Sequence, residues 1–300
     1  MTQATSQPGM RCPWCGQPIT TATGNCPRCG AALAVAPRVD QSGFEQRPAI
    51  ADMARLQFGA STCQIEGESV PVADFHLAAD DFIYFSHHRL LWTDPAITLR
   101  GKSLQGGWQR MVGGMPVFLT EAVGPGHMAL SADEPGETIA LPLDVGHAVD
   151  IQESHFLAAT SSIALALVPT LVWIKSLKAG SNDEQEMMMP LGNYFDRFVA
   201  EKKPGIVFLH CRGNCFVQNL AAGQAILIKP TAFLYKDPAV EMNLHIQYVS
   251  LPGFIHHQKI ARLWLRITGP GRIAVQSAYE PIEPISGPIM NSSGASWEGP

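Results

Sequence analysis

The sequence predicts an all-β protein. Short runs of β-branched and aromatic residues follow one another along most of its 300 residues, and 27 glycines and 23 prolines separate them. Runs rich in Ala, Glu, Lys and Leu, which favour helices, are scarce. Strands at this density with turn residues between them are typical of sandwiches, barrels and prisms. With 46% apolar residues, the chain can bury a substantial core.

Internal repeats narrow this fold class. One spacing of Leu, Gly, Ala and Ile followed by Phe-Leu occurs at 143–157 and again at 220–234, with a fainter copy at 67–77. A Gly-Pro-Gly or Pro-Gly segment introduces further alternating strands, at 124–126, 204–205 and 269–271. Glycine before a strand suits a backbone with positive φ or a close backbone approach. Because one such unit cannot bury its apolar face alone, three units around a pseudo-threefold axis are expected, as in a β-prism.

The N-terminal region predicts a zinc ribbon. Two Cys-Pro-x-Cys-Gly knuckles, ten residues apart, supply four thiolates at the spacing of a tetrahedral metal site: Cys12, Cys15, Cys26 and Cys29. Zn²⁺ held by four thiolates has no open position, so the predicted role of this cofactor is structural. Two disulfides or a redox dithiol are the alternative interpretations.

The chain divides into four predicted parts. Residues 10–31 form the ribbon, 32–54 a flexible linker, 55–280 the β domain and 281–300 a disordered, Pro/Ser/Gly-rich tail. Within the β domain, the acidic run before Met187–Met189 is expected to be a solvated loop. The three methionines are either a soft surface for a partner or fillers of a gap, which is the commoner role.

Residues 156–174 contain no charge over 19 positions, the minimum for a membrane span. Thr160-Ser161-Ser162 and Pro169 interrupt the segment, and the repeat aligns its start with the more polar Phe233–Lys236. The sequence therefore predicts two consecutive buried strands and no transmembrane segment.

The charge pattern bears on partners and compartment. The formal net charge is −5 and no basic stripe is visible, so no nucleic acid is expected as a partner. Only Arg11 and Arg28 lie near the knuckles, which disfavours nucleic-acid binding by the ribbon. The first residues lack the features of a secretory signal, and the seven cysteines fit a reducing compartment, so a cytoplasmic location is predicted.

The histidines and cysteines that could take part in catalysis do not form a catalytic pattern. No His-x-His is present, and the adjacent pairs His87-His88 and His256-His257 would point to opposite faces of a strand. Cys211 and Cys215 flank an Arg-Gly-Asn turn and are either a redox pair or, more commonly, small apolar fillers. No nucleophile elbow, paired-carboxylate motif or phosphate loop occurs. The prediction is that the protein is not an enzyme.

Several Gly-centred motifs resemble one protein family. In chain order they are Leu91-Trp92, Gly114-Met115-Pro116-Val117-Phe118-Leu119-Thr120-Glu121, Gly124-Pro125-Gly126, Pro135-Gly136-Glu137, Leu143-Asp144-Val145-Gly146, Leu263-Trp264-Leu265, Gly269-Pro270-Gly271 and Val275-Gln276. They resemble the altered inheritance of mitochondria protein 24 family over residues 55–280. The resemblance implies a β-prism of double-stranded β-helix type, similar to the tryptophan RNA-binding attenuation protein fold, and a tendency to trimeric or ring-like assembly. It implies no catalytic residues.

These observations lead to one functional expectation with two alternatives. The first is a non-enzymatic binding or scaffold protein, a self-assembling β-prism with a zinc ribbon, whose partner is a protein or a membrane-associated complex. The second is a metal- or thiol-dependent enzyme of cupin-like fold that uses the His pairs or Cys211 and Cys215. The third is nucleic-acid binding through the ribbon.

Overall fold

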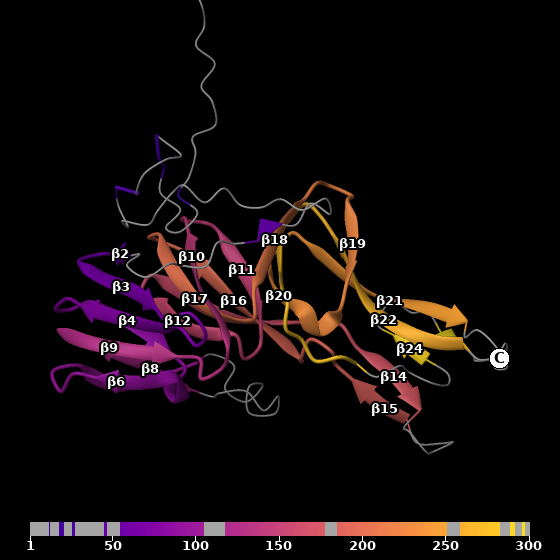
Figure 1. Cartoon of the computed structure of the whole chain (residues 1–300), viewed down its shortest axis with the longest axis horizontal. Helices are drawn as coiled ribbons and strands as arrows, with labels where there is room; N and C mark the ends of the chain where they lie inside the picture. The colour runs from indigo at the N-terminus through magenta and orange to yellow at the C-terminus, as the bar shows by residue number, and fades with distance from the viewer. Residues whose placement is uncertain are drawn as a thin grey trace, which may run out of the picture. The chain divides into compact units, whose positions relative to one another are not determined.

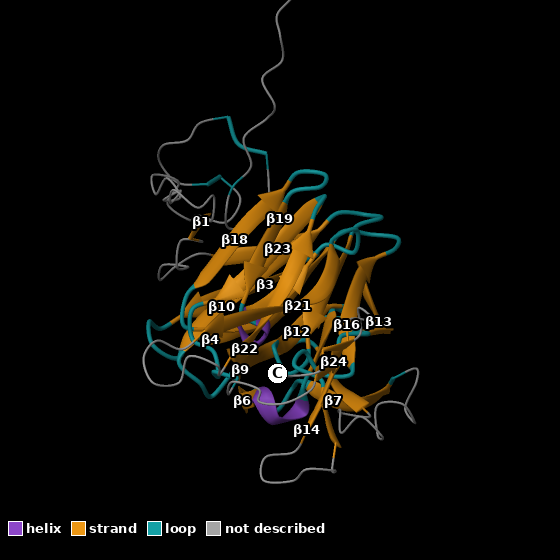
Figure 2. Cartoon of the chain, turned by 90° about the vertical axis from the view of Figure 1, so that its right-hand side faces the viewer, coloured by secondary structure: helices purple, strands orange, loops and turns teal. Residues whose placement is uncertain are grey.

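A computed structural model confirms that the protein is all-β (Figures 1 and 2). It describes residues 12, 18–20, 26–27, 45–46, 55–104, 118–177, 185–250, 259–282, 289–291 and 296–297. The described regular elements are strands, apart from two short 3-10 turns, η1 (His87–Arg89) and η2 (Pro230–Ala232). Among the described residues no helix is long and apolar enough to cross a membrane.

The strands follow one another closely, as the turn residues predict. The first twelve are β1 (Glu45–Gln46), β2 (Arg55–Phe58), β3 (Ser61–Glu66), β4 (Val72–Leu77), β5 (Phe82–Phe85), β6 (Leu90–Thr93), β7 (Thr98–Ser103), β8 (Phe118–Val123), β9 (Gly126–Ser131), β10 (Gly136–Leu143), β11 (Ala148–Gln152) and β12 (Phe156–Thr160). The others are β13 (Ile163–Pro169), β14 (Ile174–Leu177), β15 (Gln185–Met188), β16 (Tyr194–Ala200), β17 (Gly205–Arg212), β18 (Cys215–Leu220), β19 (Ala225–Ile228), β20 (Phe233–Lys236), β21 (Glu241–Ser250), β22 (Lys259–Thr268), β23 (Gly271–Gln276), β24 (Ile289–Asn291) and β25 (Ser296–Trp297).

The chain forms two compact units. The first comprises residues 1–148, 155–165 and 198–216, and the second comprises the other residues. In the first unit, one sheet has the order β2-β3-β4-β9-β6 and another the order β10-β17-β12-β5-β8-β7. The second unit contains most of a sheet that runs β1-β18-β23-β20-β11-β16-β13, together with the smaller sheets β19-β22-β21 and β15-β14-β24-β25. The strand pairs are antiparallel, for example β3 with β4 and β4 with β9.

The predicted repeats reappear as a repeated order of strands. The triplets β4-β9-β6, β10-β17-β12 and β18-β23-β20 have the same order, and the last two are each extended by three strands from earlier in the chain. The first triplet, which contains the fainter copy at 67–77, shares a turn contact with the third triplet. Asp94 accepts a hydrogen bond from the backbone N–H of His127 at 2.8 Å, and Asp237 accepts the equivalent bond from Arg272 at 2.9 Å. These turn contacts are invisible to a search for apolar spacing.

The Gly-Pro-Gly segments have the structural role that the sequence predicts. Gly126 begins β9 with φ +145°, and Gly271 begins β23 with φ +132°. A Cβ on Gly124 would collide with the carbonyl oxygen of Ala78, which lies closer than a real Cβ ever approaches backbone. These glycines therefore bring one strand end against the backbone of another, and they form no ligand cradle.

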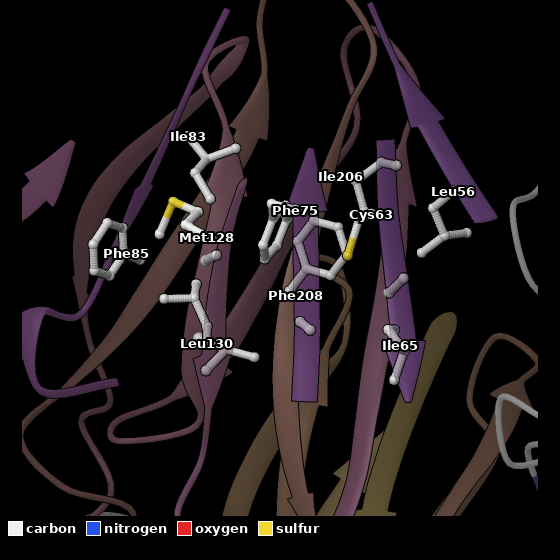
Figure 3. Packing of buried hydrophobic residues seen from close by; sticks show 14 of the residues in the cluster. Leu56, Cys63, Ile65, Phe75, Ile83, Phe85, Met128, Leu130, Ile206 and Phe208 are labelled. Atoms are coloured by element: carbon white, nitrogen blue, oxygen red, sulfur yellow. The ribbon is translucent and has the colours of Figure 1, made fainter. Parts of the chain in front are cut away.

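The core of the first unit lies between its two sheets (Figure 3). Alternate residues of β3 and β4, such as Cys63 and Phe75, are fully buried, which is the pattern of strands with one covered face. Phe75 meets Phe208 of β17 edge to face, with ring centroids 5.0 Å apart. All five residues of β12 are buried, so the uncharged stretch that starts at 156 begins as a core strand, as predicted. The prediction of a second buried strand is wrong, because only Ile163 of β13 is buried.

The segments that flank the β domain are described in part. Within 281–300, for which the sequence predicts disorder, β24 pairs with β14 and β25 pairs with β24. Met187 lies in β15 and is 54% exposed, so it does not fill a gap. Most of the linker at 32–54 and of the ribbon at 10–31 lies outside the described residues.

Gly124→Ala should lower the free energy of unfolding by about 2 kcal/mol, because the added Cβ must push two backbone segments apart. The control is Gly101→Ala on β7, where a Cβ meets nothing within 4 Å and the expected change is below about 0.5 kcal/mol. Urea unfolding followed by tryptophan fluorescence measures both. Equal stabilities for the two variants would contradict the structural role of Gly124.

Candidate functional site

The N-terminal cysteines are the first predicted site. Cys12 and Cys26 are both 2% exposed, belong to the buried cluster of the first unit and form no disulfide. Cys15 and Cys29 lie outside the described residues. Two buried cysteines, one from each knuckle, fit the donor set of a structural zinc site. The described residues on their own contain no group of three or more metal-ligating side chains.

The second predicted site is the turn between β17 and β18. Cys211 and Cys215 are fully buried on either side of Gly213, whose φ of +69° suits the tight reversal. The hydrogen bond to Cys215, followed by burial, raises the pKa of the Cys211 thiol far above its ordinary value. A thiol that stays protonated is a poor nucleophile. The pair therefore matches the interpretation as small buried fillers.

The structure agrees with the repeat at this turn and at the segment 131–137. The turns from β9 to β10 and from β17 to β18 each lead from the middle strand of one triplet to the first strand of the next, so they occupy equivalent positions. Neither turn closes a hairpin, because each joins strands of two different sheets. The two segments also meet, since β10 pairs with β17 with Gly136 opposite Arg212. Contacts across this pair lock the turn. Glu137 accepts hydrogen bonds from the side chain of Asn214 at 2.7 Å and from the backbone of Cys215 at 3.2 Å.

A cluster of charged and imidazole groups lies beside the same turn, and we call it the histidine cluster. Its members come from four segments of the first unit: Arg89, Glu134, His155, His210 and Arg212. Arg212 binds the Glu134 carboxylate with its Nε at 2.8 Å. The Nδ1 of His155 lies 2.9 Å from the carbonyl oxygen of His210, and because a carbonyl only accepts, Nδ1 carries the proton. Arg89 donates to the carbonyl oxygen of Ala132.

His210 is the least satisfied member of the cluster. Its side chain is 3% exposed, and neither ring nitrogen has a hydrogen-bond partner. Its nearest charged neighbour is Glu134, whose Oε2 is 4.0 Å from Nε2. Thr138 stands opposite His210 across β10 and β17, and its buried hydroxyl has no partner either. A neutral imidazole in this position offers one donor and one acceptor to a small polar group.

Burial decides the ionisation of the two histidines. It is the main cause that lowers the pKa of His210 to about 4, and the Glu134 charge opposes it without reversing it. Burial likewise lowers the pKa of His155 to about 4, against the hydrogen bond to the His210 backbone. Both rings are therefore neutral at pH 7. The sequence does not reveal this cluster, because no spacing links His210 to His155 and Glu134, which lie 55 and 76 positions earlier.

Of the two histidine pairs in the sequence, the structure describes one. His87 and His88 lie in η1 with ring centroids 5.5 Å apart, and burial, with the charges of Arg89 and His87, lowers the pKa of His88. His256 and His257 lie outside the described residues. The sequence assigned His87-His88 to a strand, but the residues form a 3-10 turn before β6, so the argument from opposite strand faces does not apply to them.

The second unit holds a buried ion network. Asp150 is 1% exposed, and its carboxylate accepts hydrogen bonds from Arg197 at 2.5 and 2.8 Å and an ion pair from Lys236 at 3.1 Å. Burial works against the charged carboxylate, but the Arg197 hydrogen bond and the Lys236 charge outweigh it and lower the pKa of Asp150. Every charge in this network is paired, so its role is to join β11, β16 and β20.

A family model for mitochondrial biogenesis AIM24 matches residues 63–278, which is more than two thirds of the chain. The chain belongs to this family. The match confirms the resemblance that the Gly-centred motifs carry. It begins beyond both knuckles, so it contains none of the four predicted zinc ligands. The AIM24 description states no reaction or ligand.

The all-β architecture also has a solved counterpart. The crystal structure of a Streptococcus pyogenes protein from a structural genomics programme is similar, with a TM-score of 0.51 and 17% sequence identity. The alignment covers 73% of this chain and 94% of that chain. At this identity the likeness supports the fold alone. No curated protein matched the chain.

The histidine cluster predicts a pH dependence of stability. The folded-state pKa values of His155 and His210 lie below the ordinary value of 6.5, so the unfolded chain binds protons first as pH falls. Stability is therefore full above about pH 6.5 and is lost toward pH 4, by up to about 3 kcal/mol per histidine. Urea unfolding at several pH values measures this loss.

The variant His210→Leu should show a distinctly smaller loss of stability between pH 6.5 and 4 than the wild type. The exposed histidine variant His147→Gln is the control and should keep the wild-type dependence. A wild-type dependence in His210→Leu would show that other groups cause the loss.

Proposed function

We propose that this AIM24 family member is a non-catalytic binding protein. In this proposal, Cys12, Cys15, Cys26 and Cys29 hold a structural Zn²⁺, and the β domain self-associates and presents its surfaces to a protein or membrane-associated partner. The zinc ligands would be thiolates, which fold the ribbon around the ion and leave no open coordination position for chemistry.

The burial of Cys12 and Cys26 is the observation that supports the zinc part. The two cysteines, one from each knuckle, are each 2% exposed and belong to one buried cluster, as ligands of a closed structural site would. Apolar side chains packed against the same cluster, such as Ile19, suit a ribbon that packs on the β domain. The cysteine pattern also fits a reducing compartment, and we retain the cytoplasm as the proposed location.

The chemistry of the described side chains supports a non-catalytic role. Cys211 is held protonated, His155 and His210 are neutral and buried, and the Asp150 carboxylate is neutralised by two cations. A general base or nucleophile needs access to its substrate and a pKa near the working pH. These groups lack one or both properties.

Self-assembly is proposed from the repeat. Three triplets of strands with one order are the units from which a β-prism similar to the tryptophan RNA-binding attenuation protein fold would be built. Large apolar side chains such as Leu91 (54% exposed) and Trp92 (49% exposed) lie on the edge strand β6. Exposed apolar groups on a sheet edge are features of interfaces between chains.

The zinc part predicts a defined metal content. Full-length protein purified without chelator should contain about one zinc per chain by elemental mass spectrometry, and Cys12→Ser should lose most of it. The control is Cys63→Ser, which removes a buried thiol of the β-domain core and should keep the metal. Wild-type protein without zinc, or equal zinc in both variants, would overturn the proposal.

The assembly part has a separate test. Size-exclusion chromatography with light scattering should give a mass that is a multiple of 32.4 kDa for the full chain. Leu91→Glu with Trp92→Glu should shift the protein toward the monomer, because two carboxylates cannot be buried unpaired at an edge. A wild-type mass of a single chain at micromolar concentration would exclude self-assembly.

A further inference from the structure

The three-stranded sheet of the second unit has one apolar face and one basic face. Along β22 the buried side chains of Leu263, Leu265 and Ile267 alternate with side chains that point away from the core. We define the basic face by the outward residues of this sheet and of the turn after β19: Lys229, His245, Gln247, Arg262, Trp264 and Arg266. Figure 1 shows β21 and β22 side by side, in agreement with their ten residue pairs.

An indole ring occupies the centre of the basic face. The Nε1 of Trp264 donates a hydrogen bond to Oε1 of Gln247 at 3.0 Å, which fixes the ring against the sheet. The Nζ of Lys229 lies 4.2 Å from the ring centroid, in a cation–π contact. Trp264 stands opposite His245 on β21, so two rings share the middle of the face. The indole is thus half-buried, its orientation is fixed by Gln247, and the ammonium group of Lys229 lies over the ring.

The cations of the face lack acidic partners. Arg262 stands opposite Gln247 and Arg266 opposite Asn243, so both arginines face amides across the strand pair. Within the part of the chain that the structure describes, neither arginine forms an ion pair. The exposed carboxylate on outward positions of β21 is Glu241, at the first residue of the strand, opposite Thr268 and diagonal to Arg266. Three cations and one carboxylate form a local positive patch on a chain whose net charge is −5.

We propose that the basic face binds single-stranded nucleic acid. Arg262 and Arg266 are four residues apart on one strand, a separation of about 13 Å, and Trp264 lies midway between them. Each arginine is placed for a phosphate, while the indole stacks on a base, which is the combination that single-strand binding sheets use. The amides of Gln247 and Asn243 add hydrogen-bonding groups beside the cations.

Stacking of a base on an aromatic ring is stronger than a surface cation–π contact, so the exchange of Lys229 for a base on the indole is favoured. Lys229 loses little when it leaves the ring, since its ammonium group then pairs with a backbone phosphate. The present contact therefore keeps the ring covered in the free protein and does not block the ligand.

The same features argue against a duplex or a lipid surface. The bases of a duplex are stacked on one another and offer no open face to Trp264. Binding to an anionic membrane needs apolar side chains that insert between lipids, and among the described outward residues of this sheet only Leu227 is a large exposed aliphatic group.

This inference extends beyond the proposed function, and it does not depend on the zinc site or on self-assembly.

Fluorescence anisotropy with labelled oligouridylate of about 12 nucleotides tests the proposal on the full-length protein. Trp264→Ala should weaken binding roughly fivefold to a hundredfold, and Trp264→Phe should restore most of it. Arg262→Gln with Arg266→Gln should weaken binding at least about tenfold. The same double variant should also reduce the slope of log K against log salt by about 1.4, because two phosphate contacts are lost.

The matched control is Lys202→Gln with Lys203→Gln, which removes two exposed cations from the first unit and should leave binding unchanged. Thermal unfolding confirms that all variants remain folded. Equal weakening in the control, equal binding of duplex DNA, or binding only to vesicles with anionic lipid would each overturn the proposal. No binding of oligouridylate at low salt would overturn it as well.

Discussion

The register between β10 and β17 is the constraint on which the first unit depends. Eight consecutive residue pairs, from Gly136 opposite Arg212 to Leu143 opposite Gly205, assign alternate side chains to each face. Ala140 and Phe208 thereby enter the core between the sheets, where Phe208 meets Phe75. A shift by one residue would exchange the two faces, and because β17 is buried on both faces, each of its side chains would then meet the wrong neighbours. The same register delivers Thr138, His210 and Arg212 to one end of the buried face, so the histidine cluster is a consequence of the packing.

The two units place polar groups in opposite environments. In the first unit His155 and His210 are deeply buried, and desolvation keeps them neutral where an exposed imidazole would titrate near pH 6.5. In the second unit Arg262 and Arg266 are exposed and face amides, so their charges remain available to a ligand. The net charge of −5 averages over both environments. A partner that recognises one face responds to the local charge, which the average conceals.

Turn contacts explain why two copies of the repeat are clear in the sequence and the third is faint. The spacing of Leu, Gly, Ala and Ile reports the apolar faces of the strands, and it linked 143–157 with 220–234. Asp94 and Asp237 accept hydrogen bonds from the backbone at the start of β9 and β23. In each bond the donor and the acceptor residue are more than thirty positions apart in the sequence. An apolar search cannot detect such pairs. The repeated order of strands could be established only from the hydrogen-bonded sheets.

The sequence alone determined the all-β class, the family, the strand-initiating glycines and the buried strand that starts at 156, because each depends on local spacing or residue type. The assignment of Cys12, Cys15, Cys26 and Cys29 to zinc also comes from spacing and remains a prediction. Tertiary structure decided which distant side chains meet. Glu134, His155 and His210 belong to different strands and turns, and Lys229 reaches Trp264 from the turn after β19. Register and burial create these neighbours, and neither property is encoded in the spacing of a single segment.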